Sequence, residues 1–343
     1  MSGMRGGLTL AVASAATFGT SGTFAAALLA GGWSPAAAVT ARIAVSALVL
    51  TVPGVLALRG RAGLLRTSGW RIGAYGFVAV AGCQLCYFNA IQRMPVGTAL
   101  LLEYLATVLV VAWMWLRHGQ RPRWLTISGG CAALTGLALM LGVTGTAGIN
   151  VIGVLWGLAA ALCLTVYFTL SSGSDSVPPV VMAWGGMVTG AVVLGVAGLA
   201  GALPFRAHAA DVVLLGHRVS WIVPVLGLSL VASAFAYVAG IGAARRLGAR
   251  LASFAGLSEV MFAVLFAWIF LGQLPTAGQF AGGALILAGV AAVRFDERSE
   301  PAAAQGREAP AGYTPGARPS LAVVTADSSS RSHSSIDLAR DSR

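Results

Sequence analysis

Two glutamates lie inside long apolar stretches of a chain that carries few charges. Glu103 is the only charged residue of the stretch 96–116, and Glu259 is the only charged residue of the stretch 251–271. Each stretch is long enough to cross a bilayer, where an ionised carboxylate costs on the order of a few kcal/mol. We therefore expect the two carboxylates to belong to a polar site inside the membrane, with a hydrogen bond between helices as the structural alternative for each.

Arg42 is a third charge expected within the membrane. It lies at nearly the same predicted depth as Glu103, and we hypothesise an Arg42–Glu103 ion pair. The matching position of the second half is Gly185 or Gly186, so Glu259 is expected to lack a cation. Because a buried acid without a cation favours its neutral form, a second hypothesis makes Glu259 the proton carrier. Glu103 and Arg42 are then structural, or they bind the charged ends of a solute.

Several uncharged polar side chains accompany these charges. Each suits a polar or zwitterionic solute, although a hydrogen bond between helices is an equally ordinary use of any one of them. The expected substrate or proton site therefore consists of Glu103, Glu259 and Arg42 with a polar set made of Gln84, Tyr87, Asn89, Tyr104 and Tyr237, and Tyr167 is a further candidate in the second half.

Residues typical of enzymes and metal sites are scarce in the apolar stretches. Cys83 and Cys86 have CxxC spacing, but redox or metal chemistry needs an accessible thiolate, which a membrane helix disfavours. The sequence has no HExxH or GxSxG motif, and His118, His208 and His217 fall in predicted loops. We therefore expect no metal, no cofactor and no enzymatic activity.

Composition indicates a polytopic membrane protein. The chain has 343 residues, of which 57% are hydrophobic and only 10% are charged. The net charge of +11 comes entirely from residues 1–293, which hold fifteen arginines and four acidic residues. These arginines cluster in short loops between apolar stretches, a pattern typical of membrane anchors and not of a nucleic-acid surface.

Apolar stretches of about 20 residues predict ten transmembrane helices in an all-α fold. The expected spans are 8–30, 37–57, 72–92, 96–116, 124–143, 151–171, 179–200, 219–241, 251–271 and 277–293.

Arginine distribution sets the expected orientation. With the N-terminus inside the cell, the inside loops carry eleven arginines and the outside loops carry three, namely Arg93, Arg206 and Arg218. This positive-inside bias places both termini in the cytoplasm. We expect the membrane to be a bacterial cytoplasmic (inner) membrane. The segment 294–343 is rich in Ala, Pro, Gly, Ser and Arg and is expected to be a disordered cytoplasmic tail.

The two halves of the chain resemble each other. EYLATVLVVAW at 103–113 aligns with EVMFAVLFAW at 259–268, and the motif GQRP that follows the first aligns with GQLP after the second. Because the predicted repeats 8–143 and 151–293 hold five helices each, the second must cross the membrane in the opposite sense. Both glutamates then lie about 12–14 Å along their helices, near the midplane. Inverted repeats of this kind build carriers that work by alternating access, and chance similarity between apolar segments is the alternative.

These features resemble the drug/metabolite transporter superfamily, specifically EamA-type carriers with two five-helix repeats. The resemblance covers residues 8–293, and the segment YFNAIQRMPVGTALLLEY at 87–104 is similar to the threonine/homoserine exporter branch. The resemblance implies a ten-helix carrier fold and export of an amino acid or a related compound. It is specific for the fold and weak for the solute.

The sequence therefore predicts a secondary transporter of a small polar metabolite, embedded in the lipid bilayer. Without an ATP-binding motif, transport is expected to be driven by an ion gradient, with protons as the candidate ion, by exchange or by downhill flow. Uptake of the solute or a channel-like pore are the alternatives, and an intramembrane enzyme is the most distant one. A homodimer is left open, and nucleic acid is excluded as a partner. The sequence names neither the solute, the direction of transport nor the coupling ion.

Overall fold

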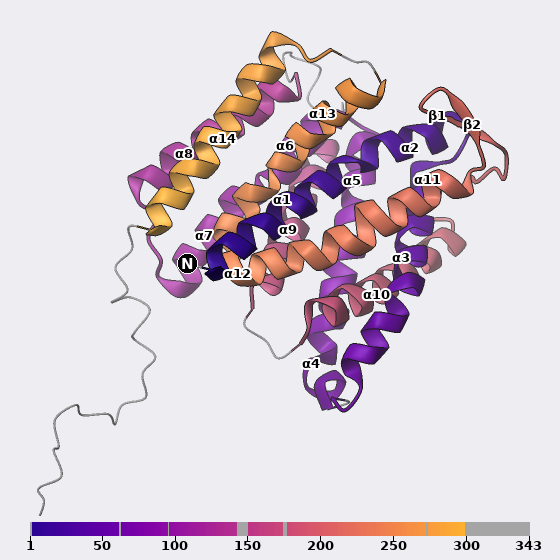
Figure 1. Cartoon of the computed structure of the whole chain (residues 1–343), viewed down its shortest axis with the longest axis horizontal. Helices are drawn as coiled ribbons and strands as arrows, with labels where there is room; N and C mark the ends of the chain where they lie inside the picture. Colours follow the sequence, from indigo (N-terminus) through magenta and orange to yellow (C-terminus); the bar gives the residue numbers. More distant parts are fainter. Residues whose placement is uncertain are drawn as a thin grey trace, which may run out of the picture. The chain divides into compact units, whose positions relative to one another are not determined.

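The computed structural model consists of α-helices, two π-helical segments and one short hairpin (Figure 1). It describes residues 2–61, 63–94, 96–142, 150–173, 177–271 and 274–298. The expected tail begins inside the last helix, which continues to Arg298, and the rest of that tail lies outside the described residues.

The first half of the described chain forms nine helical pieces. In chain order they are α1 (Ser2–Gly19), α2 (Ser21–Ala30), α3 (Pro35–Leu58), α4 (Gly63–Ala74), the π-helix η1 (Tyr75–Gly82), α5 (Cys83–Ile91), α6 (Val96–Tyr104), α7 (Ala106–His118) and, completing the half, α8 (Trp124–Met140).

The second half adds longer helices and the hairpin. In chain order they are α9 (Val151–Ser171), α10 (Pro179–Leu199), the strands β1 (Val212–Leu214) and β2 (His217–Val219), α11 (Ile222–Leu226), the π-helix η2 (Gly227–Phe235), α12 (Ala236–Gly256), α13 (Ser258–Leu271) and α14 (Ala277–Arg298).

Seven helical stretches of the described chain are long and apolar enough to cross a membrane. The helix Trp124–Met140 is a shorter apolar one. The expectation of a polytopic helical membrane protein is confirmed, whereas the count of ten is supported only roughly. One reason is that the eighth expected span continues through the expected loop 242–250 into the start of the ninth, as one helical stretch, Ile222–Gly256. Within α12 only Gly248 leaves helical geometry, with φ 79° and ψ 163°.

Local sequence explains where several helices begin. Pro35 occupies the first turn of α3, where its missing N–H is harmless, and the Ser34 hydroxyl accepts a hydrogen bond from the Ala37 N–H at 3.2 Å. Asn150 caps α9 in the same way by accepting from the Gly153 N–H at 2.9 Å. These caps satisfy backbone donors that a membrane interior cannot.

The exterior of the helices is apolar, as a lipid-facing surface must be. Leu199 is 93% exposed, Leu116 82% and Trp124 80%, values that would be costly in water for side chains of this size. The interior in turn is rich in alanine and glycine, which lets helix backbones approach closely.

Close glycine contacts join α8 to α14, the two helices that run side by side in Figure 1. A Cβ on Gly136 would lie 2.5 Å from the Gly282 carbonyl oxygen, and a Cβ on Gly129 would lie 2.9 Å from the Gly289 carbonyl oxygen. Both contacts are too short for any side chain, so the spacing of seven residues in both helices fixes how they pack.

The β-hairpin and the segment before it form a structure that the all-α expectation lacks. The Trp33 indole N–H donates to the His208 carbonyl at 2.8 Å, and the Ser34 N–H donates to the Arg206 carbonyl at 2.8 Å. Trp33 also packs on Trp221, with ring centroids 5.5 Å apart. The segment 204–221 is thereby fastened to the connection between α2 and α3.

Candidate functional site

A cavity of about 860 Å³ lies among helices of both halves of the chain. We call it the central cavity. It brings together seven of the eight residues expected in the site, which come from α3, α5, α6, α12 and α13: Arg42, Gln84, Tyr87, Glu103, Tyr104, Tyr237 and Glu259.

Both glutamates lie at interruptions of their helices. Between α6 and α7 the Leu105 N–H donates to the Leu102 carbonyl at 3.1 Å, and between α12 and α13 the Leu257 N–H donates to the Phe254 carbonyl at 3.1 Å. Each is an i to i−3 bond, the tight turn of a 3₁₀-helix. The same device therefore positions a carboxylate in each half of the chain.

The carboxylates have different hydrogen-bond donors. The Cys83 thiol, at the start of α5, donates to Glu103 Oε1 at 3.2 Å. The Tyr104 hydroxyl donates to Glu259 Oε2 at 3.0 Å. The second bond joins the end of α6 to the first turn of α13, so it links the two halves of the chain across the cavity.

Arg42 is placed differently from the sequence-based hypothesis. No ion pair within 4.0 Å joins Arg42 to Glu103 in the described chain, so that hypothesis is wrong. The residue lines the central cavity, as do Glu259 and Tyr237. Its Nε is buried and has no hydrogen-bond partner among the described residues. Counting residues along each helix predicts a similar depth in the membrane for Arg42 and Glu103. It does not predict the rotation of the helices, which decides whether the two side chains face each other.

Asn89 is the expected site residue that the structure does not bring to the cavity. Its amide Nδ2 donates to the Leu85 carbonyl at 2.9 Å, one turn earlier on α5. The Arg93 guanidinium donates to the Asn89 carbonyl at 2.7 Å. The side chain of Asn89 therefore makes its hydrogen bond within its own helix.

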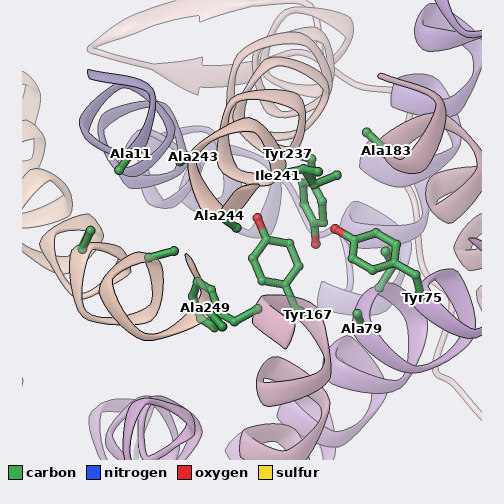
Figure 2. Close-up of a cluster of buried hydrophobic side chains, with 14 of the residues drawn as sticks. Ala11, Tyr75, Ala79, Tyr167, Ala183, Tyr237, Ile241, Ala243, Ala244 and Ala249 are labelled. Atoms are coloured by element: carbon green, nitrogen blue, oxygen red, sulfur yellow. The ribbon is translucent and has the colours of Figure 1, made fainter. Parts of the chain in front are cut away.

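Three tyrosines pack together at one wall of the cavity (Figure 2). We call Tyr75, Tyr167 and Tyr237 the tyrosine cluster. Ring centroids are 5.8 Å apart for Tyr75 and Tyr167 and 5.7 Å apart for Tyr167 and Tyr237. Tyr167 and Tyr237 line the cavity, whereas Tyr75 lies behind them and is fully buried. The polarity and aromaticity of this wall suit a solute with an aromatic or amphipathic side chain.

Sequence reasoning missed Cys83 and Ser14, which also line the cavity. Cys83 was expected to be structural because a thiol among apolar residues resembles core filling. One signal was present, because Cys83 and Tyr87 are four residues apart and therefore share a helix face. Ser14 donates to the Ala236 carbonyl at 2.8 Å, a contact between distant segments that no local pattern indicates.

The lining of the cavity reaches the ends of two helices on one side. Its lining includes Leu141 at the end of α8 and Gln279 in the first turn of α14. The opposite ends of the helices bear Arg121, Arg123, Arg246 and Arg250, and we call this the arginine side. There the Arg250 guanidinium donates to Gln120 Oε1 at 3.2 Å, which joins α12 to the residues after α7.

These features define a polytopic helical membrane protein with a polar central cavity built from both halves of one chain. The sequence model of the EamA-like transporter family matches residues 5–142 and again residues 151–295. The chain therefore belongs to the EamA-like transporter family, and the resemblance to the drug/metabolite transporter superfamily is confirmed.

Individual relatives and one solved structure agree with this membership. The chain is 24% identical over 238 residues to the uncharacterized inner membrane transporter YicL of Salmonella typhimurium. The aligned region covers 67% of this chain and 74% of the relative. It is 30% identical over 149 residues to the aromatic amino acid exporter YddG of Ancylobacter novellus. This aligned region covers 40% of this chain and 51% of the relative. A crystal structure matches with a TM-score of 0.71 at 20% identity, over 87% of this chain and 99% of that one, which shows the same fold.

Proposed function

We propose that this transporter exports an amino acid or a closely related zwitterion across a bacterial cytoplasmic membrane. The similarity to an exporter of aromatic amino acids supports the solute class and the direction. The similarity to an inner membrane transporter supports the location. The arginine side faces the cytoplasm in this proposal, together with both termini, because arginine-rich loops stay on that side of the membrane.

One observation carries the proposal, namely a cation and two carboxylates that face one cavity without neutralising each other in a salt bridge. Arg42 lines the cavity with a buried Nε that has no hydrogen-bond partner. Glu103 and Glu259 line the same cavity and accept hydrogen bonds only from a thiol and a phenol among the described groups. A zwitterion supplies the missing partner for both signs of charge at once.

The roles follow from charge. Arg42 binds the carboxylate of the solute, because a guanidinium offers only donors in a planar fork. Glu259, which lines the same cavity as Arg42, binds the ammonium group. The side chain of the solute then contacts Tyr167 and Tyr237 on the aromatic wall. Specificity comes from that wall, while the charged groups recognise what all amino acids share.

Alternating access is the mechanism that we propose for this cavity. In this proposal the Arg250–Gln120 hydrogen bond closes the arginine side, while the lining of the cavity reaches helix ends on the other side. Related helix interruptions at Leu105 and Leu257 give each half a hinge beside its glutamate. Both halves belong to one chain, so a single chain suffices as the transport unit, and the repeats 8–143 and 151–293 are the two moving parts.

Proton coupling, where it exists, is better assigned to Glu103 than to Glu259. The earlier assignment to Glu259 required a carboxylate far from any cation, and Glu259 shares the central cavity with Arg42. Glu103 accepts its hydrogen bond from a thiol and Glu259 accepts one from a phenol, and because a thiol is the weaker donor, it stabilises the ionised carboxylate less. A carrier that moves one proton per zwitterion then binds the proton at Glu103 and the ammonium group of the zwitterion at Glu259. We infer a carrier and not an enzyme, in agreement with the family.

The test is a comparison of secreted metabolites. Wild type, Glu103→Gln, Glu259→Gln and Arg42→Gln are overexpressed in a bacterial host, matched for membrane abundance, and the medium is profiled by untargeted mass spectrometry. We expect one or a few amino acids to accumulate outside only with wild type. A wild-type profile identical to that of the empty vector contradicts export, and profiles unchanged in all three variants contradict the assigned site.

A further inference from the structure

A second cavity, of about 400 Å³, lies where the ends of several helices meet the segment before the hairpin. We call it the hairpin pocket. Its lining comes from the end of α2, the connection to α3, Gln92 after α5, and the segment after α10 that includes Leu203, Pro204 and Arg206. None of the described residues that line it also lines the central cavity, so it is a separate site.

The hairpin pocket lies at the end of the helices opposite the arginine side. The hairpin directly precedes the helical stretch Ile222–Gly256, and Arg246 and Arg250 lie near the end of that stretch. Figure 1 shows the hairpin beside the end of α2. Trp33 and Trp221 pack on each other here, and tryptophan is typical of the boundary between a membrane and water. The pocket therefore lies at the level of lipid headgroups.

Ser34 offers this pocket a hydrogen-bond donor. It is 6% exposed, and its hydroxyl oxygen accepts from the Ala37 N–H at 3.2 Å and from the Arg206 N–H at 3.0 Å. A hydroxyl has two lone pairs and one hydrogen, so these two bonds leave only the hydrogen. The described chain provides no acceptor for it. Because Ser34 lines the pocket, that hydrogen is available to a ligand there.

Arg206 adds a positive charge to the same place. Two hydrogen bonds fix its backbone to Ser34, because its N–H donates to the Ser34 hydroxyl and its carbonyl accepts from the Ser34 N–H at 2.8 Å. Its guanidinium has no acidic partner within 4.0 Å in the described chain, and no acidic residue is among the described lining residues. A guanidinium beside a free hydroxyl hydrogen matches an anion that accepts several hydrogen bonds, such as a phosphate.

The rest of the lining is mostly apolar. The Trp33 indole N–H already donates to the His208 carbonyl, so what Trp33 offers the pocket is apolar ring surface. Leu29 lines the pocket and is 42% exposed, so the apolar lining continues into the lipid-facing surface. A free phosphate gains nothing from such a wall, whereas an acyl chain gains by covering it. The apolar residues of the lining are Leu29, Trp33, Pro35, Ala36, Leu203 and Pro204.

We propose that the hairpin pocket binds a phospholipid of the bilayer. The phosphate accepts hydrogen bonds from Ser34 and Arg206, and part of an acyl chain covers the apolar lining. The bound lipid contacts the connection between α2 and α3 together with the segment after α10, so it joins the two halves of the chain at one end of the helices.

Lipid titration is the first test. Delipidated protein in detergent is titrated with phosphatidylglycerol, and bound molecules are counted by native mass spectrometry. The variants are Arg206→Gln, which removes the cation, and Gln92→Glu, which places a carboxylate in the lining. We expect each to raise the Kd about tenfold, the effect of losing one hydrogen bond to a charged group. Arg218→Gln on β2 removes an exposed arginine outside the lining and should match wild type.

Two partial ligands identify what the pocket recognises. Diacylglycerol has the chains without the phosphate, and glycerol 3-phosphate has the phosphate without the chains. Weaker binding of both than of phosphatidylglycerol supports the proposal. Glycerol 3-phosphate bound as tightly as the lipid makes the pocket a site for a soluble anion and overturns the proposal, as does a Kd for the lipid that neither Arg206→Gln nor Gln92→Glu changes.

Thermal unfolding is the second test. A ligand that binds only the folded state raises its stability, so phosphatidylglycerol should raise the unfolding midpoint of wild type and of Arg218→Gln. With lipid at about ten times the wild-type Kd, a tenfold weaker site keeps only about a third of this stabilisation, which is the result expected for Arg206→Gln and Gln92→Glu. An equal rise in all four proteins overturns the site. Neither measurement uses the transported solute, so this proposal and the proposed function are tested separately.

Discussion

The two segments that match the transporter family share their scaffold but not their polar groups. Each has one π-helix, Tyr75–Gly82 in the first and Gly227–Phe235 in the second, and each interrupts a helix beside a glutamate. Among the described residues, only the first supplies a cavity arginine and only the second has a β-hairpin. In the proposed mechanism, the π-helices and helix interruptions that both segments share serve the movement of alternating access. The cavity arginine serves solute recognition, and the hairpin stabilises the helices that it contacts.

Packing shows the same relation between the segments. The helix α8 packs along α14, its counterpart by position, and α3 packs along α10. The contact of α1 with α12 has its counterpart in the contact of α9 with α5 and η1. An inverted repeat requires these exchanges, which support the proposal that 8–143 and 151–293 are its two units.

The largest effect is expected where the two segments differ most, at Arg42. Arg42→Gln removes the cation that we assign to the solute carboxylate, and the cavity has no second arginine among its lining residues. We expect kcat/KM for transport to fall about 100-fold, equivalent to about 2.7 kcal/mol, because truncating one partner of a buried charge pair costs this much or more. The measurement is uptake of labelled amino acid into proteoliposomes.

Arg93→Gln is the matched control for Arg42→Gln. Arg93 donates to Asn89 outside the central cavity, so its loss should change transport less than about twofold, as expected for an exposed charge. Arg42→Gln at more than a third of the wild-type rate would contradict the role of Arg42 and leave the asymmetry between the segments without a function.

The charged groups of the site could be predicted from the amino-acid sequence, whereas their hydrogen-bond partners could not. Glu103, Glu259 and Arg42 stand out because a charge in an apolar stretch is rare, and all three line the central cavity. The partner of Glu103 is Cys83, a residue without charge in a stretch that reads as core, and nothing local indicates the pairing. Contacts across 20 or 155 residues depend on helix rotation, which periodicity does not fix.

Secondary structure was predictable where composition decides it and not where single residues do. The span 151–171 has the observed bounds of α9, because an apolar run ends there on both sides. The residues 242–250 contain three arginines and were expected to be a loop, yet only Gly248 departs from helical geometry. A φ of 79° is open to glycine, so one residue turns the chain where a loop was expected.

The second largest effect tests what the segments share, the glycine contacts of α8 with α14. Gly136→Leu and Gly282→Leu each place a side chain against the carbonyl oxygen of the opposite glycine. We expect each to lower the free energy of unfolding by about 2–3 kcal/mol, as overpacking does, and to a similar extent. Thermal unfolding in detergent measures this.

Gly195→Leu on α10 is the control for the two glycine variants. A Cβ on Gly195 meets no atom within 4 Å, so the substitution should leave the midpoint nearly unchanged. Strong destabilisation by Gly282→Leu with none by Gly136→Leu would mean that the two sides of this contact are not equivalent, against the proposed repeat.

A smaller effect is expected at the hydrogen bonds of the two glutamates. Tyr104→Phe removes the donor to Glu259, and Cys83→Ala removes the donor to Glu103. A phenol is the stronger donor, so we expect the kcat/KM of transport to fall about fivefold for Tyr104→Phe and less for Cys83→Ala, within the range of single hydrogen bonds. Transport kinetics at a series of pH values separates the two.

The pH series also decides which glutamate carries a proton. If Glu103 carries it, Cys83→Ala shifts the pH dependence of transport, whereas Tyr104→Phe lowers the rate at every pH. A shift in Tyr104→Phe alone would return the role to Glu259 and would contradict the division of labour between the two carboxylates.

The smallest effect is expected at the feature present only in the second segment, the hairpin and the segment before it. Trp33→Phe removes the donor to the His208 carbonyl and part of the packing on Trp221. We expect a loss of about 1 kcal/mol in the free energy of unfolding, the contribution of one hydrogen bond and one ring contact, with transport unchanged. A brace that holds α2 and α3 together while the rest of the carrier moves should tolerate this loss. A variant of normal stability that transports several times faster or slower would instead make the hairpin a part of the moving machinery.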